Sequence, residues 1–302
     1  MPHNYQFYFN KIKLPKSNSH KGQNGKVLVV GGSKLFHSSI FWSAQVASKF
    51  VDMVHFSSPA NENNQLVRTK LKQGFWQGIV IDWQNIDAYL EEDDVVLIGP
   101  GMERSKETRE IVDDLLKRYP NAKWVIDGGA LQEVDPSLLG KGHIITPHKK
   151  ELERLVKHHS KNSSLTQAAS NPKTKQLEVL KQARLSVGGG QDDKIELISQ
   201  LTGRGVTILA KNVLDRVYSH DKVIEIKGGN AGLTKGGSGD ILAGLVAALY
   251  TQVDAATACV VASVTIKKSA EALWQQVGPN FNADDLIKQI PQTFWELYRT
   301  KS

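Results

Sequence analysis

A glycine-rich turn that leads directly into an apolar segment is the part of this sequence best suited to chemistry. It reads GNAGLTKGGSGDILA from Gly229 to Ala243, and alanine and leucine continue at helical spacing beyond it. The first turn of a helix has unpaired N–H groups and a partial positive charge, so it can hold a phosphate or an oxyanion. The predicted anion cradle consists of Gly236, Gly237, Ser238 and Gly239.

Asp240 follows this cradle immediately and allows two interpretations. An aspartate is a good N-cap residue for a helix, and capping requires no further partner. Alternatively, its carboxylate accepts the proton of an attacking hydroxyl beside the bound phosphate, and the oxygen then displaces that phosphate in line. The two roles are compatible, because the carboxylate and the anion site share one short loop.

Short apolar runs alternate with amphipathic segments from about residue 25 onward, which is typical of a sheet flanked by helices. Most of these runs are almost continuously apolar, as in parallel strands buried on both faces. The segment 216–229 instead predicts two strands around the polar turn SHDK, and therefore an antiparallel hairpin at one edge. We expect the other strands at 26–32, 53–58, 94–100, 123–129, 143–148 and 206–211, and helices at 38–50, 106–118, 149–158, 193–201, 240–251 and 254–277.

Four of the loops that follow these strands have glycine or a helix-starting motif. They read GGS after the first strand, then GPGM, DGGA and TPHKKE. Open α/β sheets bind ligands at the carboxyl ends of their parallel strands, and glycine allows backbone to approach a ligand closely. The sequence therefore predicts an α/β fold with its ligand site at this edge of a mostly parallel sheet.

Bulk properties limit the class of protein. The 302 residues are 40% hydrophobic and 23% charged, as in ordinary globular proteins, and no apolar run is long enough to span a bilayer. The first 25 residues lack the apolar core of a secretory signal, so we expect a cytoplasmic protein without membrane association. Cys259 lies in an apolar run and is expected to be a buried, structural residue.

The net charge of +7 favours polyanionic partners, which include nucleic acids and small phosphorylated ligands. The lysines and arginines are scattered and are not interleaved with aromatic residues, so we expect no nucleic-acid binding. We expect one domain at 19–302 behind an N-terminal extension, 1–18. The polar, serine-rich stretch at about 160–193 predicts a flexible surface insertion with a short helix at 174–185.

The GGSGD turn and its helix resemble the GTGD anion-hole motif of the ribokinase-like superfamily. The longer segment NAGLTKGGSGDILAG resembles the NAD(P)H-hydrate dehydratase family, whose members repair hydrated nicotinamide cofactors. Three further segments agree with this family in the same order: SHKGQNGKVLVVGGS at 19–33, LIGPGM at 97–102 and ITPHKKELERL at 145–155. The resemblance runs from about residue 19 to 290, apart from the insertion, and implies a ribokinase-like three-layer sandwich.

The resemblance also implies a reaction. In the family, a nucleoside phosphate donor phosphorylates the ring hydroxyl of hydrated NADH or NADPH, and phosphate then leaves as the cofactor is restored. Asp240 is then the catalytic base, and the N–H groups of Gly237, Ser238 and Gly239 stabilise the transferring phosphoryl group. The implied cofactors are ADP or ATP as donor, with Mg²⁺ bridging its phosphates. The sequence leaves both donors and both hydrated substrates open.

Other residues match positions of the family's site. The resemblance implies a substrate-binding role for Ser39, Gly101, Asp127 and His148, and a nucleotide-binding role for Lys211, Asn212, Asp215, Gly236 and Gly239. For His148, the alternative is a histidine at the end of a strand that is hydrogen-bonded to backbone. For Glu151, stabilisation of a helix dipole and contact with a metal ion or phosphate-bound water are equally open. The expected partner is the small-molecule substrate, and the chain is expected to form a homo-oligomer.

Three segments depart from the family's pattern. DGGAL keeps Asp127 but has Gly129 in place of a second acid, AKN has Asn212 in place of glycine, and Phe36 and Ser38 replace a tyrosine and a glycine. Two alternatives to dehydration therefore stay open. One is a kinase of the same fold that leaves a stable phosphorylated alcohol, and the other is a catalytically silent nucleotide-binding protein.

Overall fold

The computed structural model describes residues 5–73, 77–163, 191–220 and 222–300. Within these ranges, nine strands form one sheet in the order β3-β2-β1-β4-β5-β6-β7-β8-β9. Neighbours from β3 to β7 are parallel, while β7, β8 and β9 are antiparallel, so the predicted mostly parallel sheet with an edge hairpin is confirmed. The strands are β1 Lys26–Val30, β2 Met53–Ser57, β3 Gly78–Val80, β4 Val95–Ile98, β5 Trp124–Ile126, β6 His143–Ile145, β7 Thr207–Ala210, β8 Asp215–Ser219 and β9 Lys222–Ile226.

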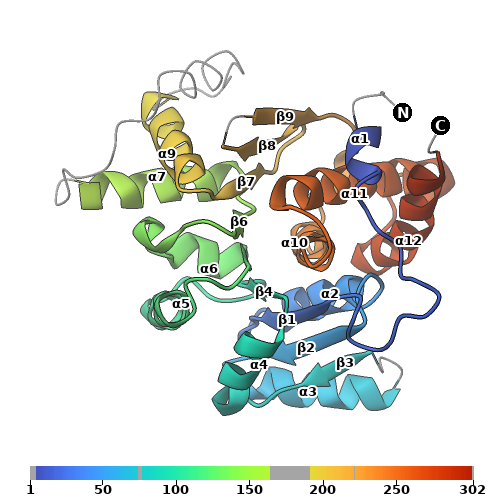
Figure 1. Cartoon of the computed structure of the whole chain (residues 1–302), viewed down its shortest axis with the longest axis horizontal. Coiled ribbons are helices and arrows are strands. Elements are labelled where there is room, and N and C mark those ends of the chain that lie inside the picture. The colour runs from blue at the N-terminus through green and yellow to red at the C-terminus, as the bar shows by residue number, and fades with distance from the viewer. Residues whose placement is uncertain (1–4, 74–76, 164–190, 221, 301–302) are drawn as a thin grey trace.

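Helices cover both faces of this sheet and make the expected three layers (Figure 1). The helices are α1 Gln6–Phe9, α2 His37–Ala47, α3 Asn61–Gln73, α4 Ile86–Glu92, α5 Lys106–Arg118, α6 Gly128–Glu133, α7 Lys149–Ser163, α9 Gln191–Gly203, α10 Ser238–Tyr250, α11 Ala255–Val277 and α12 Ala283–Arg299. One face packs against α2, α10, α11 and α12, and the other against α4, α5, α6, α7 and α9. None of the helices in the described ranges has the length and apolarity that crossing a membrane requires.

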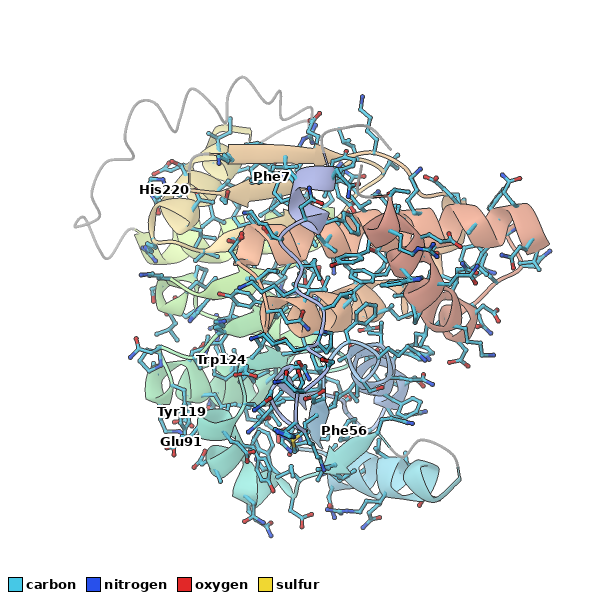
Figure 2. The ribbon with its side chains drawn as sticks, turned by 45° about the vertical axis from the view of Figure 1, so that its right-hand side comes forward. Phe7, Phe56, Glu91, Tyr119, Trp124 and His220 are labelled. Atoms are coloured by element: carbon cyan, nitrogen blue, oxygen red, sulfur yellow. The ribbon has the colours of Figure 1, made fainter. Side chains whose placement is uncertain are left out.

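Successive side chains of the central strands point to opposite faces of the sheet, so they belong to two separate hydrophobic cores. In β1, Val27 and Val29 belong to the core beneath α2 and α10, whereas Leu28 and Val30 belong to the opposite core. Phe56 and Trp124 are large side chains buried in the first and second core, respectively (Figure 2). Strands with both faces buried in this way explain why the sequence shows almost continuous apolar runs.

Several elements differ from the sequence predictions. All six apolar runs form strands, but each strand ends before the glycine or polar residues of its loop. The predicted elements do not include β3, α1, α3, α4, α6 and α12. α1 has only four residues, and α3 begins with the polar run NENNQ. Cys259 is fully buried, as expected, and burial raises the pKa of its thiol. The central part of the predicted insertion, including the helix at 174–185, lies outside the described residues.

Residues of the predicted N-terminal extension pack against the core. Phe9 on α1 is fully buried, and Tyr5 donates a hydrogen bond from its hydroxyl to the Glu225 carbonyl at 2.7 Å. Lys11 forms an ion pair of 3.1 Å with Asp254, the N-cap of α11. This segment therefore ties the hairpin edge of the sheet to the helices beside it.

The strand order reverses between β1 and β4, and the loops after these two strands interlock there. Gly32 donates its N–H to the Pro100 carbonyl at 2.7 Å, and a side chain at Gly31 would overlap that carbonyl. Gly99 has φ +116°, and a Cβ on it would overlap the Asp127 carbonyl. Such reversal points are where open α/β sheets bind ligands. The GGS and GPG glycines are thus required by backbone contacts that shape this edge.

Replacing Gly99 by alanine is expected to destabilise the fold by about 3 kcal/mol or more, because a left-handed backbone and an overlap with backbone coincide there. Gly140→Ala is the matched control, since nothing lies within 4 Å of a Cβ at that position. Urea unfolding of both variants measures the difference. Equal stability of the two variants would contradict the interlocked arrangement.

Candidate active site

The predicted anion cradle lies at the start of α10. Gly237 is the N-cap, with φ +96°, and a Cβ there would come within 2.7 Å of the Trp42 ring. Within the described part of the chain, no atom accepts a hydrogen bond from the N–H groups of Gly236, Gly237 or Gly239. Three unpaired donors at the positive end of a helix form a site for an anion.

The loop before α10 is held by side chains. Ser238 donates its hydroxyl to the carbonyl of Leu233 at 2.6 Å, and Lys235 donates to the carbonyls of Pro279 and Phe281 at 2.6 Å each. Gly236 is exposed, and nothing lies within 4 Å of a Cβ built on it. The fold therefore does not explain the glycine at position 236, whereas an anion that approaches the backbone does.

Asp240 does not cap the helix. It is the third residue of α10, three positions after the N-cap, so the capping interpretation of the sequence is wrong. α10 packs closely on α2: a side chain at Gly244 would overlap the Ser43 carbonyl. The Ser43 hydroxyl donates a hydrogen bond to the Asp240 carbonyl at 2.8 Å. Ser39, one turn earlier on α2, lies close enough to the Asp240 carboxylate to oppose the rise in its pKa. The predicted substrate residue Ser39 thus lies beside the predicted base.

A charged cluster meets this helix start from the ends of three neighbouring strands. Asp127, directly after β5, accepts hydrogen bonds from Lys211 Nζ and from the Thr146 hydroxyl, both at 2.6 Å. Lys211, directly after β7, also lies beside the cradle, since its Nζ is 3.6 Å from where a Cβ of Gly239 would be. The parallel order β5-β6-β7 brings these residues to one edge of the sheet. Lys211 therefore links the acidic residues to the anion site.

His148 and Glu151 hold the start of α7 reciprocally, in the manner of a capping box. Glu151 accepts the His148 N–H at 2.8 Å, and His148 Nδ1 accepts the Glu151 N–H at 3.2 Å. Gln132 on α6 donates to the other Glu151 oxygen at 3.0 Å. Glu151 is buried, which supports its role at the helix start, while the His148 side chain is 49% exposed. Because Nδ1 accepts, a neutral His148 has its proton on Nε2, which lies 3.5 Å from Glu151 Oε1.

The electrostatics of the cluster tune the predicted base. Burial, followed by the negative charge of Asp127, raises the pKa of the Asp240 carboxyl to about 7, against the opposing effects of Lys211 and Ser39. Burial also raises the pKa of Glu151. For Lys211, burial alone would lower the pKa, but the carboxylates of Asp127, Glu151 and Asp240 outweigh it and raise that pKa. A carboxyl with a pKa near neutrality is suited to accept a proton.

The pH profile of the reaction is expected to follow Asp240. A base must be deprotonated to act, so kcat/KM should rise with pH through about 7 and then level off. Asp127→Asn removes a negative charge that raises the pKa of Asp240 and should therefore move the midpoint to lower pH. Steady-state rates between pH 5 and pH 9 measure both midpoints. An unchanged midpoint in the variant would contradict the coupling of the two carboxyls.

Gly101 adjoins the substrate side of the cluster. It has φ +72°, and a Cβ there would overlap the Phe36 carbonyl and lie 3.1 Å from the Ser39 Cβ. The GPG loop and the start of α2 therefore pack directly on each other. The structure brings together all four predicted substrate residues, Ser39, Gly101, Asp127 and His148, at the carboxyl edge of the sheet.

The predicted nucleotide residues beyond Lys211 form a braced turn. Asp215 accepts from the Asn212 N–H at 2.7 Å and from the Ser263 hydroxyl at 2.7 Å, and both Asp215 and Ser263 are buried. Lys267 is 3.5 Å from the Asp215 carboxylate and donates to the Val213 carbonyl at 3.0 Å. The structure thus gives Asp215 a role in holding the turn, and its contact with nucleotide stays a prediction, as does that of Asn212.

The metal prediction depends on the carboxylates around Lys211. Among the residues that the structure describes, no group of three His, Cys, Asp or Glu side chains is arranged to hold a metal ion. Mg²⁺ in phosphoryl-transfer sites usually keeps several waters and takes one or two carboxylates together with substrate phosphates. Asp127, which pairs with Lys211 at 2.6 Å, and Glu151, whose charge also raises the pKa of Lys211, offer that kind of partial donor set. The residues therefore fit a Mg²⁺ ion that arrives with a polyphosphate.

Comparison with known proteins agrees with this geometry. The family model described as NAD(P)H-hydrate dehydratase matches residues 27–292. A bifunctional NAD(P)H-hydrate repair enzyme of Methanocaldococcus jannaschii is 30% identical over an alignment of 285 residues that covers 93% of this chain and 50% of that protein. An ATP-dependent (S)-NAD(P)H-hydrate dehydratase of Aedes aegypti is 27% identical, with 95% of this chain and 82% of that protein covered.

A solved structure shows the same fold. It is an ADP/ATP-dependent NAD(P)H-hydrate dehydratase of Bacillus subtilis co-crystallised with ATP and Mg²⁺, with a TM-score of 0.69, 19% identity and 97% of each chain covered. The chain spans about half the length of the bifunctional repair enzymes that it matches. The sheet, the helix layers and the family match over 27–292 agree, and the chain belongs to the NAD(P)H-hydrate dehydratase family.

Proposed function

We propose that this protein restores hydrated NADH or NADPH in a reaction that consumes ADP or ATP. One observation carries the proposal: Asp240, a carboxyl whose pKa is raised to about 7, lies in the same helix turn as three unpaired backbone N–H donors. A base beside an anion cradle is the minimum needed to transfer a phosphoryl group to a hydroxyl. The family's function supplies the identity of that hydroxyl.

Different residues of the chain are proposed to act in the different steps of the reaction. Asp240 takes the proton of the ring hydroxyl, and the oxygen forms a bond to the terminal phosphorus of the donor as the donor's bridging P–O bond breaks. The N–H groups of Gly236, Gly237 and Gly239, with Lys211, stabilise charge on the transferring group. The new phosphate ester then leaves with its oxygen as the ring loses a proton and regains its double bond. Phosphate is a better leaving group than hydroxide, and this is the reason for transferring a phosphoryl group to the ring hydroxyl.

Other residues of the cluster are proposed to bind and orient the substrate ring and the Mg²⁺ ion. We expect His148 and the Ser39 hydroxyl to contact the hydrated ring, and Gly101 allows the GPG loop to pack on the start of α2 beside Ser39. When bound, Mg²⁺ neutralises charge on the donor phosphates, and Asp127 and Glu151 are the residues that would hold it. Both donors named for the relatives, ADP and ATP, present the terminal phosphate that the cradle takes. The homo-oligomer and the cytoplasmic location remain predictions.

Purified protein incubated with hydrated NADH and either ADP or ATP tests this function. Return of the reduced-nicotinamide absorbance band that depends on added nucleotide supports it. Absence of any return with both nucleotides and both hydrated cofactors would refute it. A hydroxylated vitamin precursor assayed in parallel tests the kinase alternative, for which a stable phosphorylated product is expected.

Gly236→Ala is expected to impair the anion cradle while leaving the stability of the fold almost unchanged. The position has open space around it, so stability should change by less than about 1 kcal/mol, whereas a methyl group beside the anion should lower kcat/KM for the donor about tenfold or more. Gly140→Ala is again the matched control. An unimpaired Gly236→Ala enzyme would mean that the phosphate does not approach this backbone.

A further inference from the structure

A second set of charges lies beside the proposed site and is not used by its chemistry. A cavity of about 640 Å³ opens next to His148 and Glu151, and we call it the basic cavity after the four cations that line it: Arg104, Lys150, Arg154 and Lys157. Three of them come from α7 at positions i, i+4 and i+7, which lie on one face of a helix. Arg104 comes from the loop after β4.

Most of this positive charge has no internal partner. Arg154 pairs with Glu133 at 3.1 Å, and Glu153, which also lines the cavity, pairs with Lys194 at 3.1 Å. In the described ranges, no ion pair links Arg104, Lys150 or Lys157 to a carboxylate. Three exposed cations without an ion pair around one hollow favour the approach of a multiply charged anion.

The basic cavity adjoins the proposed active site through two shared residues. His148 and Glu151 line it, and both also belong to the cluster around Lys211. His148 therefore lies between the cluster around Lys211 and the cations of α7. A ligand whose ring lies beside Asp240 and whose other end is anionic can extend past His148 into this cavity.

A neighbouring cavity has the opposite charge. It measures about 290 Å³, lies at the GGS loop, and is lined by Glu62, Glu103 and Glu107 with Lys34 as its cation. Its excess of carboxylates disfavours a phosphate, which carries negative charge itself. Of the two cavities that flank the loop of Met102, the basic one is therefore the electrostatic choice for a phosphate.

We propose that the basic cavity binds a phosphate group of the hydrated dinucleotide, distant from the ring that reacts. This inference rests on the proposed function. Two groups of the substrate have the required chemistry: the pyrophosphate, which NADH hydrate and NADPH hydrate share, and the 2′-phosphate, which only NADPH hydrate has. The donor's phosphates instead belong at the cradle of α10.

The test is the double variant Lys150→Glu/Lys157→Glu, with Lys117→Glu/Lys288→Glu as a control of equal charge change on other exposed surfaces. KM for the hydrated dinucleotide should rise about tenfold or more in the first variant, with kcat little changed, and stay within about twofold in the control. A rise for both substrates assigns the cavity to the pyrophosphate. A rise for NADPH hydrate alone assigns it to the 2′-phosphate.

Other outcomes would overturn the inference. These are an unchanged KM for both dinucleotides in an active double variant, or a rise in KM for the donor nucleotide alone. The conservative variant Lys150→Gln/Lys157→Gln should give a smaller rise in the same KM. Failure of the proposed function is distinguishable, because then neither wild type nor control restores either cofactor. Calorimetric binding of intact NADPH and NADH to the same variants gives a readout independent of turnover.

Discussion

Asp240→Asn is expected to lower kcat about 10³-fold, because the amide cannot accept the proton of the ring hydroxyl. Donor affinity should change little, since the N–H groups that hold the phosphate belong to Gly236, Gly237 and Gly239. Single-turnover rates with hydrated NADH measure the loss, and equilibrium titration with ADP or ATP measures the affinity. Turnover close to that of the wild type would contradict the assignment of the base.

The same variant is expected to be more stable than the wild type above pH 7. The pKa of Asp240 is raised to about 7 in the folded protein from its ordinary value of 3.8, so folding disfavours its charged form. The resulting cost is absent below about pH 4, grows up to about pH 7 and is constant above it, at a few kcal/mol. Asparagine removes this cost. Urea unfolding at pH 5 and pH 8 measures the difference in stability between the variant and the wild type. An Asp240→Asn variant that is less stable than the wild type at pH 8 would contradict the burial of this charge.

Lys211→Met is the second substitution with a large expected effect. It removes the cation that lies among Asp127, Glu151 and Asp240, so the pKa of Asp240 should rise further. The kcat/KM for the donor should fall about 100-fold, and the pH midpoint should move to higher pH, opposite to the shift in Asp127→Asn. Stability should fall by about 3 kcal/mol, because the Asp127 carboxylate loses its buried partner.

A control separates lost stability from lost chemistry. His55 and Asp93 form another buried pair, 2.8 Å apart, on β2 and before β4. His55→Gln should also lower stability but leave the pH midpoint where it is. If Lys211→Met and His55→Gln affected the pH profile alike, the special position of Lys211 beside Asp240 would be refuted.

Local signals in the sequence were sufficient for the cradle and the sheet. Glycines before an apolar segment identify a helix start, and continuous apolar runs identify buried parallel strands, since both patterns depend on neighbours in sequence. The capping role of Asp240 was wrong because the sequence GGSGD does not reveal which residue first adopts helical dihedrals. Gly237, with φ +96°, ends the turn three residues earlier.

The pairings across the sheet could not be predicted from the sequence. Lys211 and Asp127 are 84 residues apart, and their contact depends on the register of β5, β6 and β7. Thr146 and Gln132 are ordinary polar residues that acquire a role only through this register. Lys267 had one available signal, a lysine within the apolar run of α11, which indicates a buried partner.

Product stoichiometry is the most direct test of phosphorylation followed by elimination at Asp240. With excess hydrated NADH and limiting ATP or ADP, the proposed reaction predicts one NADH and one inorganic phosphate for every phosphoryl group that leaves the donor nucleotide. A phosphorylated product that accumulates while nucleotide is consumed, without NADH, would contradict elimination and assign the chain to the kinase alternative. Nucleotide that binds but is never consumed would contradict catalysis altogether.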